Sequence, residues 1–224
     1  MMLRSAGLGL VLAGSACAQN LQLSVRVFDG TNWSDSFLAL RGSTVRVGIW
    51  MSGDTSIYGM GGATMRLTGT SLVAGDSVRF AEGTSTGRMA PFNFGAATNA
   101  IFRDSASTFR IDDSNDVLNI NGSAGMTFFQ RDPATANPGT FSTANPALCF
   151  AFDVTIAAEW APDRDIVMSL DQLSRGLAAY YTAANASRPA TAGATLNSAV
   201  IHVWPTPSTG VVLGLAVLGG RRRR

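Results

Sequence analysis

The chain has 224 residues, of which 46% are hydrophobic and 14% are charged, a composition that suits one domain with a sizeable core. It contains no lysine, and five of its 17 arginines lie near the ends, at Arg4 and Arg221–Arg224. Without those five, 12 arginines face 15 acidic residues, so the body between the ends carries a net charge of −3. We therefore expect no nucleic-acid partner, because such binding depends on clustered cations that neutralise phosphates.

The first 18 residues predict a secretory signal peptide. Arg4 gives a basic start, Leu8–Ala13 is a short apolar run, and Ala16-Cys17-Ala18 fits the small-x-small pattern in which Ala16 and Ala18 flank the cleavage signal. Cys17 offers a lipoprotein alternative, which Gly14 disfavours because a lipobox usually has leucine there. The sequence therefore predicts an exported protein whose mature chain begins after Ala18.

Cys149 is the only cysteine that remains after such cleavage. A single thiol forms no internal disulfide, so the exported domain must be stable through its core alone. Because Cys149 lies in the apolar segment Ala147–Phe152, we expect a small buried strand residue rather than a nucleophile.

The C-terminal 21 residues, 204–224, form three consecutive parts. Trp204–Thr209 contains a Pro-x-Pro spacer, Gly210–Gly220 is an apolar run of small residues, and four arginines follow. An apolar run of this length is short for a permanent membrane span, which needs about 20 residues. The four arginines are typical of a basic cluster that keeps the end of a membrane segment on the cytoplasmic side. This pattern indicates a transient membrane association, with an ordinary C-terminal membrane tail as the alternative.

This end of the chain resembles the PEP-CTERM sorting signals, which exosortases recognise in bacteria that secrete polysaccharide matrices. Pro205, Pro207, Ser208 and the cluster Arg221, Arg222, Arg223 and Arg224 match the pattern, whereas Thr206 stands where the family has glutamate. The resemblance implies two kinds of partner, the secretion and exosortase-type sorting machinery and extracellular polysaccharide. It also implies a final location in the cell envelope, at the surface or outside the cell.

The body, residues 19–203, alternates apolar and polar side chains with a period of two, which is typical of β-strands. Glycine-rich turns separate the runs, so we predict an all-β fold, a single β-sandwich or jelly roll. Residues 170–184 fit a short helix or a strand equally well, and residues 83–100 predict a long surface loop. The apolar alternating positions are Leu21–Val27, Val45–Met51, Ala63–Leu67, Phe109–Ile111, Val117–Ile120, Leu148–Ile156, Ile166–Leu170 and Ala199–Val203.

The segment from Gly42 to Leu67 is similar to cohesin-like and carbohydrate-binding jelly rolls. The similarity consists of a Gly-Ser-Thr-Val start at Gly42–Val45, a strand, and a glycine-rich crossing into another strand. It implies an architecture and no function.

No set of side chains in the body predicts a catalytic site. His202 is the single histidine, and its position in the last strand, opposite in parity to Ile201 and Val203, predicts a side chain that faces solvent. The only glutamates are Glu82 and Glu159, and a secreted polysaccharide hydrolase that uses an Asp/Glu pair stays as the third alternative. We therefore expect a protein that is not an enzyme.

Two features suggest ligands. Asp112, Asp113, Asn115 and Asp116 supply oxygen ligands of the kind Ca²⁺ prefers, although Asx-rich turns also arise for backbone reasons alone. Trp33, in a polar turn, is the tryptophan we expect to be exposed and able to stack on a sugar ring. The sequence thus predicts a structural or interaction protein of the surface or matrix, or alternatively a carbohydrate-binding module, with or without calcium.

Overall fold

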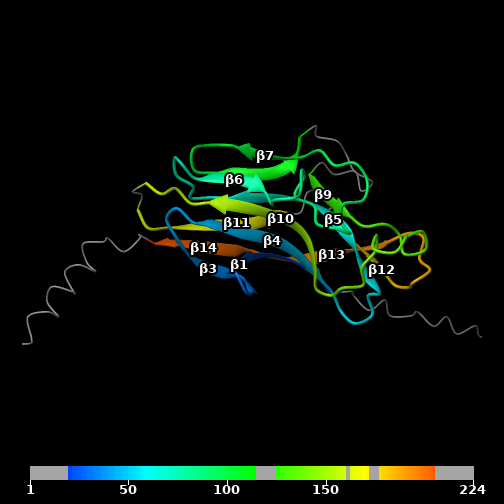
Figure 1. The fold of residues 1–224 in the computed structure, drawn as a ribbon. Coiled ribbons are helices and arrows are strands. Elements are labelled where there is room, and N and C mark those ends of the chain that lie inside the picture. Colours follow the sequence, from blue (N-terminus) through cyan, green and yellow to red (C-terminus); the bar gives the residue numbers. More distant parts are fainter. Residues whose placement is uncertain (1–19, 115–124, 160–161, 172–176, 205–224) are drawn as a thin grey trace, which may run out of the picture.

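The computed structural model describes residues 20–114, 125–159, 162–171 and 177–204, and in these ranges the chain forms β-strands and no helix (Figure 1). None of the same ranges contains a helix that could cross a bilayer. The strands are β1 (Leu21–Phe28), β2 (Trp33–Ser34), β3 (Ser36–Leu40), β4 (Thr44–Ser52), β5 (Gly59–Gly69), β6 (Ser77–Phe80), β7 (Asn99–Arg103), β8 (Phe109–Asp113), β9 (Met126–Phe129), β10 (Ala147–Thr155), β11 (Arg164–Asp171), β12 (Leu177–Tyr181), β13 (Ala190–Asn197) and β14 (Ala199–Trp204).

The strands are arranged in two packed layers (Figure 1). One layer has the order β6-β10-β4-β1, and the other has the order β3-β14-β11-β5 with β8 and β7 beyond β5. The long strand β5 pairs with β12 and β9 through its first half, and β12 and β13 connect it to β1. The two layers are therefore joined by hydrogen-bonded strands on one side. On the other side, β3 and β6 are the two end strands of this continuous strand order.

The apolar positions predicted from period-two alternation meet between the layers, which confirms the all-β sandwich. Nearly every one of them is buried, from Leu21–Val27 on β1 to Ile201 and Val203 on β14. Cys149 is buried as expected, and burial raises the pKa of its thiol well above the usual value. The expected strand at Val117–Ile120 lies outside the described residues.

Strand β10 departs from the predicted alternation at its start. Leu148 was expected to share the buried face of Phe150, but a β-bulge between them shifts the register against β4. The extra residue, Cys149, turns inward, and Leu148 consequently faces the outer surface. The prediction for Leu148 was wrong because period-two alternation assumes one residue per pairing position.

Two other stretches can be compared with the sequence expectations. The ambiguous segment 170–184 is strand at the end of β11 and in β12, and residues 182–184 after β12 are bends and turn. Residues 83–100 are irregular up to β7 as expected, but Phe92 within them is fully buried in the core. An aromatic side chain from a loop fills space that the strands leave open.

The chain passes from one layer to the other at a tight corner between β3 and β4. Ser43 donates its backbone N–H to the Leu40 carbonyl at 3.2 Å, and its hydroxyl donates to the same oxygen at 2.5 Å. Gly42, with a φ of +77°, donates to the Ile156 carbonyl, and Ile156 donates back to Ser43. Glycine suits the left-handed backbone that this corner requires.

A buried ion pair fixes the same end of the sandwich. Arg164, at the start of β11, donates through one nitrogen to both carboxylate oxygens of Asp76 at 2.7 Å. The Asp76 side chain has no exposed surface, and that of Arg164 is 8% exposed. Asp76 also accepts the backbone N–H groups of Val73 and Ala157, so one carboxylate binds the segments around β6, β10 and β11.

We predict that Asp76→Asn lowers the free energy of unfolding by about 3–5 kcal/mol, because it leaves a buried guanidinium without its counter-ion. Urea unfolding of the mature protein measures the loss. The matched control is Asp104→Asn, which breaks the exposed pair with Arg110 and should cost less than about 1 kcal/mol. Equal losses in the two variants would contradict the role assigned to Asp76.

Candidate functional site

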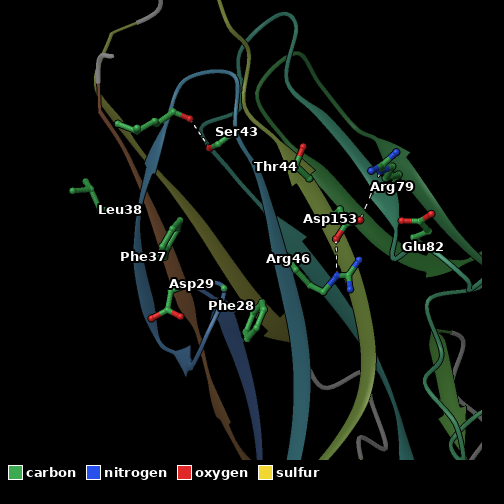
Figure 2. A pocket seen from close by; sticks show the side chains of 12 residues that line it. Phe28, Asp29, Phe37, Leu38, Ser43, Thr44, Arg46, Arg79, Glu82 and Asp153 are labelled. Atoms are coloured by element: carbon green, nitrogen blue, oxygen red, sulfur yellow. Dashed lines mark hydrogen bonds and ion pairs between the residues drawn. The ribbon is translucent and has the colours of Figure 1, made fainter. Parts of the chain in front are cut away.

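A groove lies where the two layers separate, beside the corner that joins β3 to β4 (Figure 2). Its volume is about 570 Å³. The groove has an apolar wall from β3 and the end of β1, and a charged wall from β4, β6 and β10. It is lined by Phe28, Asp29, Gly30, Phe37, Leu38, Leu40, Ser43, Thr44, Arg46, Arg79, Glu82 and Asp153.

The apolar wall follows from the pleat of β3. Phe37 packs against the core on the groove side of β3, and Leu38, which also lines the groove along this edge strand, directs its side chain to the opposite face (Figure 2). Strand β3 pairs with β14 alone among the described strands, so its other edge faces the groove. The wall thus combines an aromatic side chain with an edge strand.

The charged wall is organised around Asp153 of β10, whose side chain is 4% exposed. Arg46 of β4 donates from Nε to one carboxylate oxygen at 3.0 Å, and Nε of Arg79 on β6 lies 3.7 Å from the other (Figure 2). The hydrogen bond to Asp153 raises the pKa of Arg46. Each carboxylate oxygen of Asp153 therefore faces a guanidinium group, and this charge is paired within the wall of the groove.

Asp29 closes one end of the groove in the turn between β1 and β2. Its carboxylate accepts the backbone N–H groups of Asn32 at 2.6 Å and Thr31 at 2.7 Å. These two hydrogen bonds, that of Asn32 first, lower the pKa of Asp29. The turn is therefore held by an ionised aspartate, as Asx turns commonly are.

An aromatic cluster adjoins the groove through Phe28, on the outer face of β1 and β4. The Phe28 and Trp33 rings are 5.1 Å apart between centroids, and those of Trp33 and Trp50 are 5.5 Å apart in an edge-to-face arrangement. The Arg26 guanidinium lies 5.9 Å from the Trp50 ring centroid. Trp33 is therefore half-buried among aromatic rings, where the sequence predicted an exposed side chain in a turn.

Gly48 makes room for this cluster. A β-carbon added at Gly48 would lie 2.7 Å from the Trp33 ring and 2.7 Å from the Leu148 side chain. The bulge in β10 directs Leu148 to this face, so the cluster depends on both the bulge and the glycine. Leu148, whose orientation was predicted wrongly, thus packs beside the aromatic cluster that adjoins the groove.

A second cavity, also about 570 Å³, lies under β9 and β12. Tyr181 donates its hydroxyl to Asp132 at 2.6 Å, and burial and then this hydrogen bond raise the pKa of Tyr181. Phe94, which is 45% exposed, and Arg188 are among its lining residues. The cavity contains a neutral tyrosine anchored to an aspartate.

The residues predicted to bind calcium are only partly described. Asp112 is 5% exposed and accepts from Arg66 at 2.7 Å and Arg110 at 2.8 Å, and Asp113 accepts from the Thr98 hydroxyl. Asn115 and Asp116 lie outside the described residues, so the calcium site stays a prediction. Within the described ranges no three His, Cys, Asp or Glu side chains gather as metal ligands do.

Of the remaining candidates that the structure describes, Glu82 lies at the groove and the others lie apart from it. His202 faces outward as expected, and its Nδ1 is 2.7 Å from Asp165. Glu82 lines the groove, whereas Glu159 is exposed beyond β10. The signal-cleavage residues Ala16 and Ala18, and the sorting motif at Pro205–Ser208 with Arg221–Arg224, lie outside the described residues.

Sequence reasoning missed Phe37, Arg46, Arg79 and Asp153. Each stands in a strand where a charged or aromatic residue is ordinary, and only the register that pairs Arg46 with Asp153 and Asp153 with Arg79 brings the charges together. The one available signal was a charged residue inside an otherwise apolar run, Asp153 between Phe152 and Val154.

Comparison with known proteins gives structural neighbours at low identity. No protein-family model matches the chain, and no curated protein sequence matches it. The sixth cohesin of scaffoldin B from Acetivibrio cellulolyticus is 15% identical, with a TM-score of 0.42 over 83% of this chain and 99% of that one. A type I cohesin from Pseudobacteroides cellulosolvens is 12% identical, with a TM-score of 0.45 over 84% and 94%. A type III cohesin of a cell-surface anchoring scaffoldin from Ruminococcus flavefaciens is 10% identical, with a TM-score of 0.43 over 87% and 93%.

No residue role and no partner is carried over from these neighbours to this chain.

We predict that Gly48→Ala costs about 1–3 kcal/mol of unfolding free energy, because its methyl group overlaps Trp33 and Leu148. The intrinsic tryptophan fluorescence of the native protein should change as Trp33 is displaced. Urea unfolding followed by fluorescence measures both effects.

Gly193→Ala is the matched control, since Gly193 lies on an exposed position of β13 with no atom within 4 Å of an added β-carbon. It should change stability by no more than about 0.5 kcal/mol. A Gly48→Ala protein as stable as this control, with unchanged fluorescence, would show that the cluster tolerates a side chain there.

Proposed function

We propose that this chain is an exported, non-enzymatic interaction module that is sorted through its C-terminal signal and acts at the cell surface or in the extracellular matrix. The groove between β3 and β4 carries the proposal. Asp153 holds Arg46 and Arg79 in its charged wall, and these guanidinium side chains are still 42% and 66% exposed. Its other wall is an aromatic side chain beside a strand edge that none of the described strands pairs with. Such a surface offers contact area and directional hydrogen-bonding groups to a ligand.

The proposed route to the surface rests on the two ends of the sequence. The basic start and the Ala16-Cys17-Ala18 site direct export, and the Pro-x-Pro spacer, apolar run and arginine cluster direct processing by an exosortase-type enzyme. After processing, the β-sandwich is the part that remains to interact with the envelope or with extracellular polysaccharide.

We expect the protein recovered from the surface or medium of its native host to have the mass of a chain from Gln19 to about Pro207, plus any attached group. Replacing all four terminal arginines with alanine should leave the C-terminus unprocessed, because the arginine cluster is part of the proposed sorting signal. Intact-mass measurement of each cell fraction tests this.

Replacing the same arginines with lysine is the control, because it keeps the charge and should keep the sorting. An unprocessed wild-type chain in the membrane fraction would contradict the processing step. Polysaccharide turnover by the processed protein, abolished by Glu159→Gln, would contradict the non-enzymatic assignment.

A second function, carbohydrate binding, is favoured by one specific observation, the aromatic cluster of Phe28, Trp33 and Trp50 beside the groove. Aromatic faces present apolar area to sugar rings. On a glycan array probed with and without Ca²⁺, this function predicts binding that Trp33→Ala abolishes.

Trp204→Ala provides the comparison for the array, because Trp204 is an exposed tryptophan on the other layer and should not affect the signal. Circular dichroism establishes that both variants are folded. An array without signal in either condition would rule against this second function.

A further inference from the structure

The outer face of β3 and β14 carries an exposed apolar patch, which we call the β3–β14 patch. It consists of Leu38, Leu40 and Trp204, which are 50%, 48% and 57% exposed. Leu40 and Trp204 are register partners in the parallel pair β3–β14, and Leu38 is opposite His202. The three side chains are therefore neighbours on one face although 164 positions separate Leu40 from Trp204 in the numbering.

The core does not account for these side chains. Their strand neighbours Phe37, Ala39 and Val203 face inward, so the pleat places Leu38, Leu40 and Trp204 on the opposite, outer face. Outer positions of a sandwich layer are ordinarily polar. Three large apolar side chains gathered on such a face indicate an interaction surface.

The position of the patch in the chain indicates what covers it. Strands β3 and β14 run parallel, so both end at the end of the sandwich where the described chain ends at Trp204. The apolar run of the C-terminal signal begins at Gly210. The intervening residues span at most about 20 Å, at 3.3–3.6 Å per residue. A membrane that holds the apolar run would therefore be within reach of the patch.

We propose that the β3–β14 patch contacts the lipid surface while the C-terminal segment is still in the membrane. This inference rests on the proposed function, because it requires the apolar run to enter a bilayer. Tryptophan is enriched at membrane–water interfaces, and a tether of this length gives the patch a high local concentration at the surface. The polar groups that border the patch, His202 and Asp165, are paired with each other at 2.7 Å.

The contact orients the sandwich on the membrane. The corner between β3 and β4 lies at the membrane end, because Leu40 precedes it directly. The loop before β10 lies at the opposite end, since β10 starts against the last part of β4, with Ala147 opposite Met51. Thr143 in that loop is exposed, so it should stand away from the lipid.

The test uses the mature full-length chain with its C-terminal segment, reconstituted into phosphatidylethanolamine–phosphatidylglycerol vesicles. A polarity-sensitive dye is attached at Leu38→Cys or, as the matched control, at Thr143→Cys, and Cys149 is buried and should not react in the folded protein. We expect a blue shift at position 38 that quenchers in the lipid reduce, and no shift at position 143. Adding Leu40→Ser and Trp204→Ser should abolish the shift at position 38.

Flotation of the vesicles separates this inference from the function on which it rests. A chain that does not float with the vesicles overturns both. A chain that floats, with the dye at position 38 responding no more than the dye at position 143, overturns the lipid contact alone. A blue shift that appears without vesicles and grows with protein concentration identifies a second copy of the chain as the occupant, and also overturns it.

Discussion

The corner between β3 and β4 is the constraint on which the rest of the molecule depends. Four hydrogen bonds hold it, two from Ser43 to Leu40 and a reciprocal pair between residues 42–43 and Ile156. Because the chain changes layer there, β3 and β4 cannot pair with each other as a hairpin would. The groove lies where these two strands diverge, and among the described strands none pairs with the groove-side edge of β3.

Strand β3 consequently serves two surfaces at once. Its inward side chain Phe37 lines the groove, and its outward residues Leu38 and Leu40, which also line the groove along this edge, form the patch shared with Trp204. A five-residue strand can do this because successive side chains point to opposite faces. Substitution of Phe37 therefore affects the groove and leaves the patch in place, whereas Leu38 and Leu40 contribute to both surfaces.

The sequence was sufficient for the fold class and for most central strands, because burial on one face leaves a period-two pattern in residues such as Val45–Met51. It was insufficient where pairing decides the outcome. The bulge that turns Leu148 outward has no signature in the pattern, and β3 was missed because Phe37–Leu40 is apolar throughout and does not alternate. The candidate site was hidden for the same reason, since Arg46, Arg79 and Asp153 become neighbours only through strand register. Trp33 was identified from the sequence, but the aromatic rings that surround it, Phe28 and Trp50, come from β1 and β4.

The parallel pairing of β3 and β14 also gives the molecule a polarity. Strand β10 alone, with nine residues, extends about 30 Å from one end of the sandwich to the other at 3.3–3.4 Å per residue. Whatever attaches to the chain after Trp204 holds one end, and the loop around Thr143 becomes the outermost part of the protein. A molecule displayed in this way would present that distal end to the surroundings of the cell, and the outer face of β1 and β4, on the other layer, would stay accessible to neighbouring molecules.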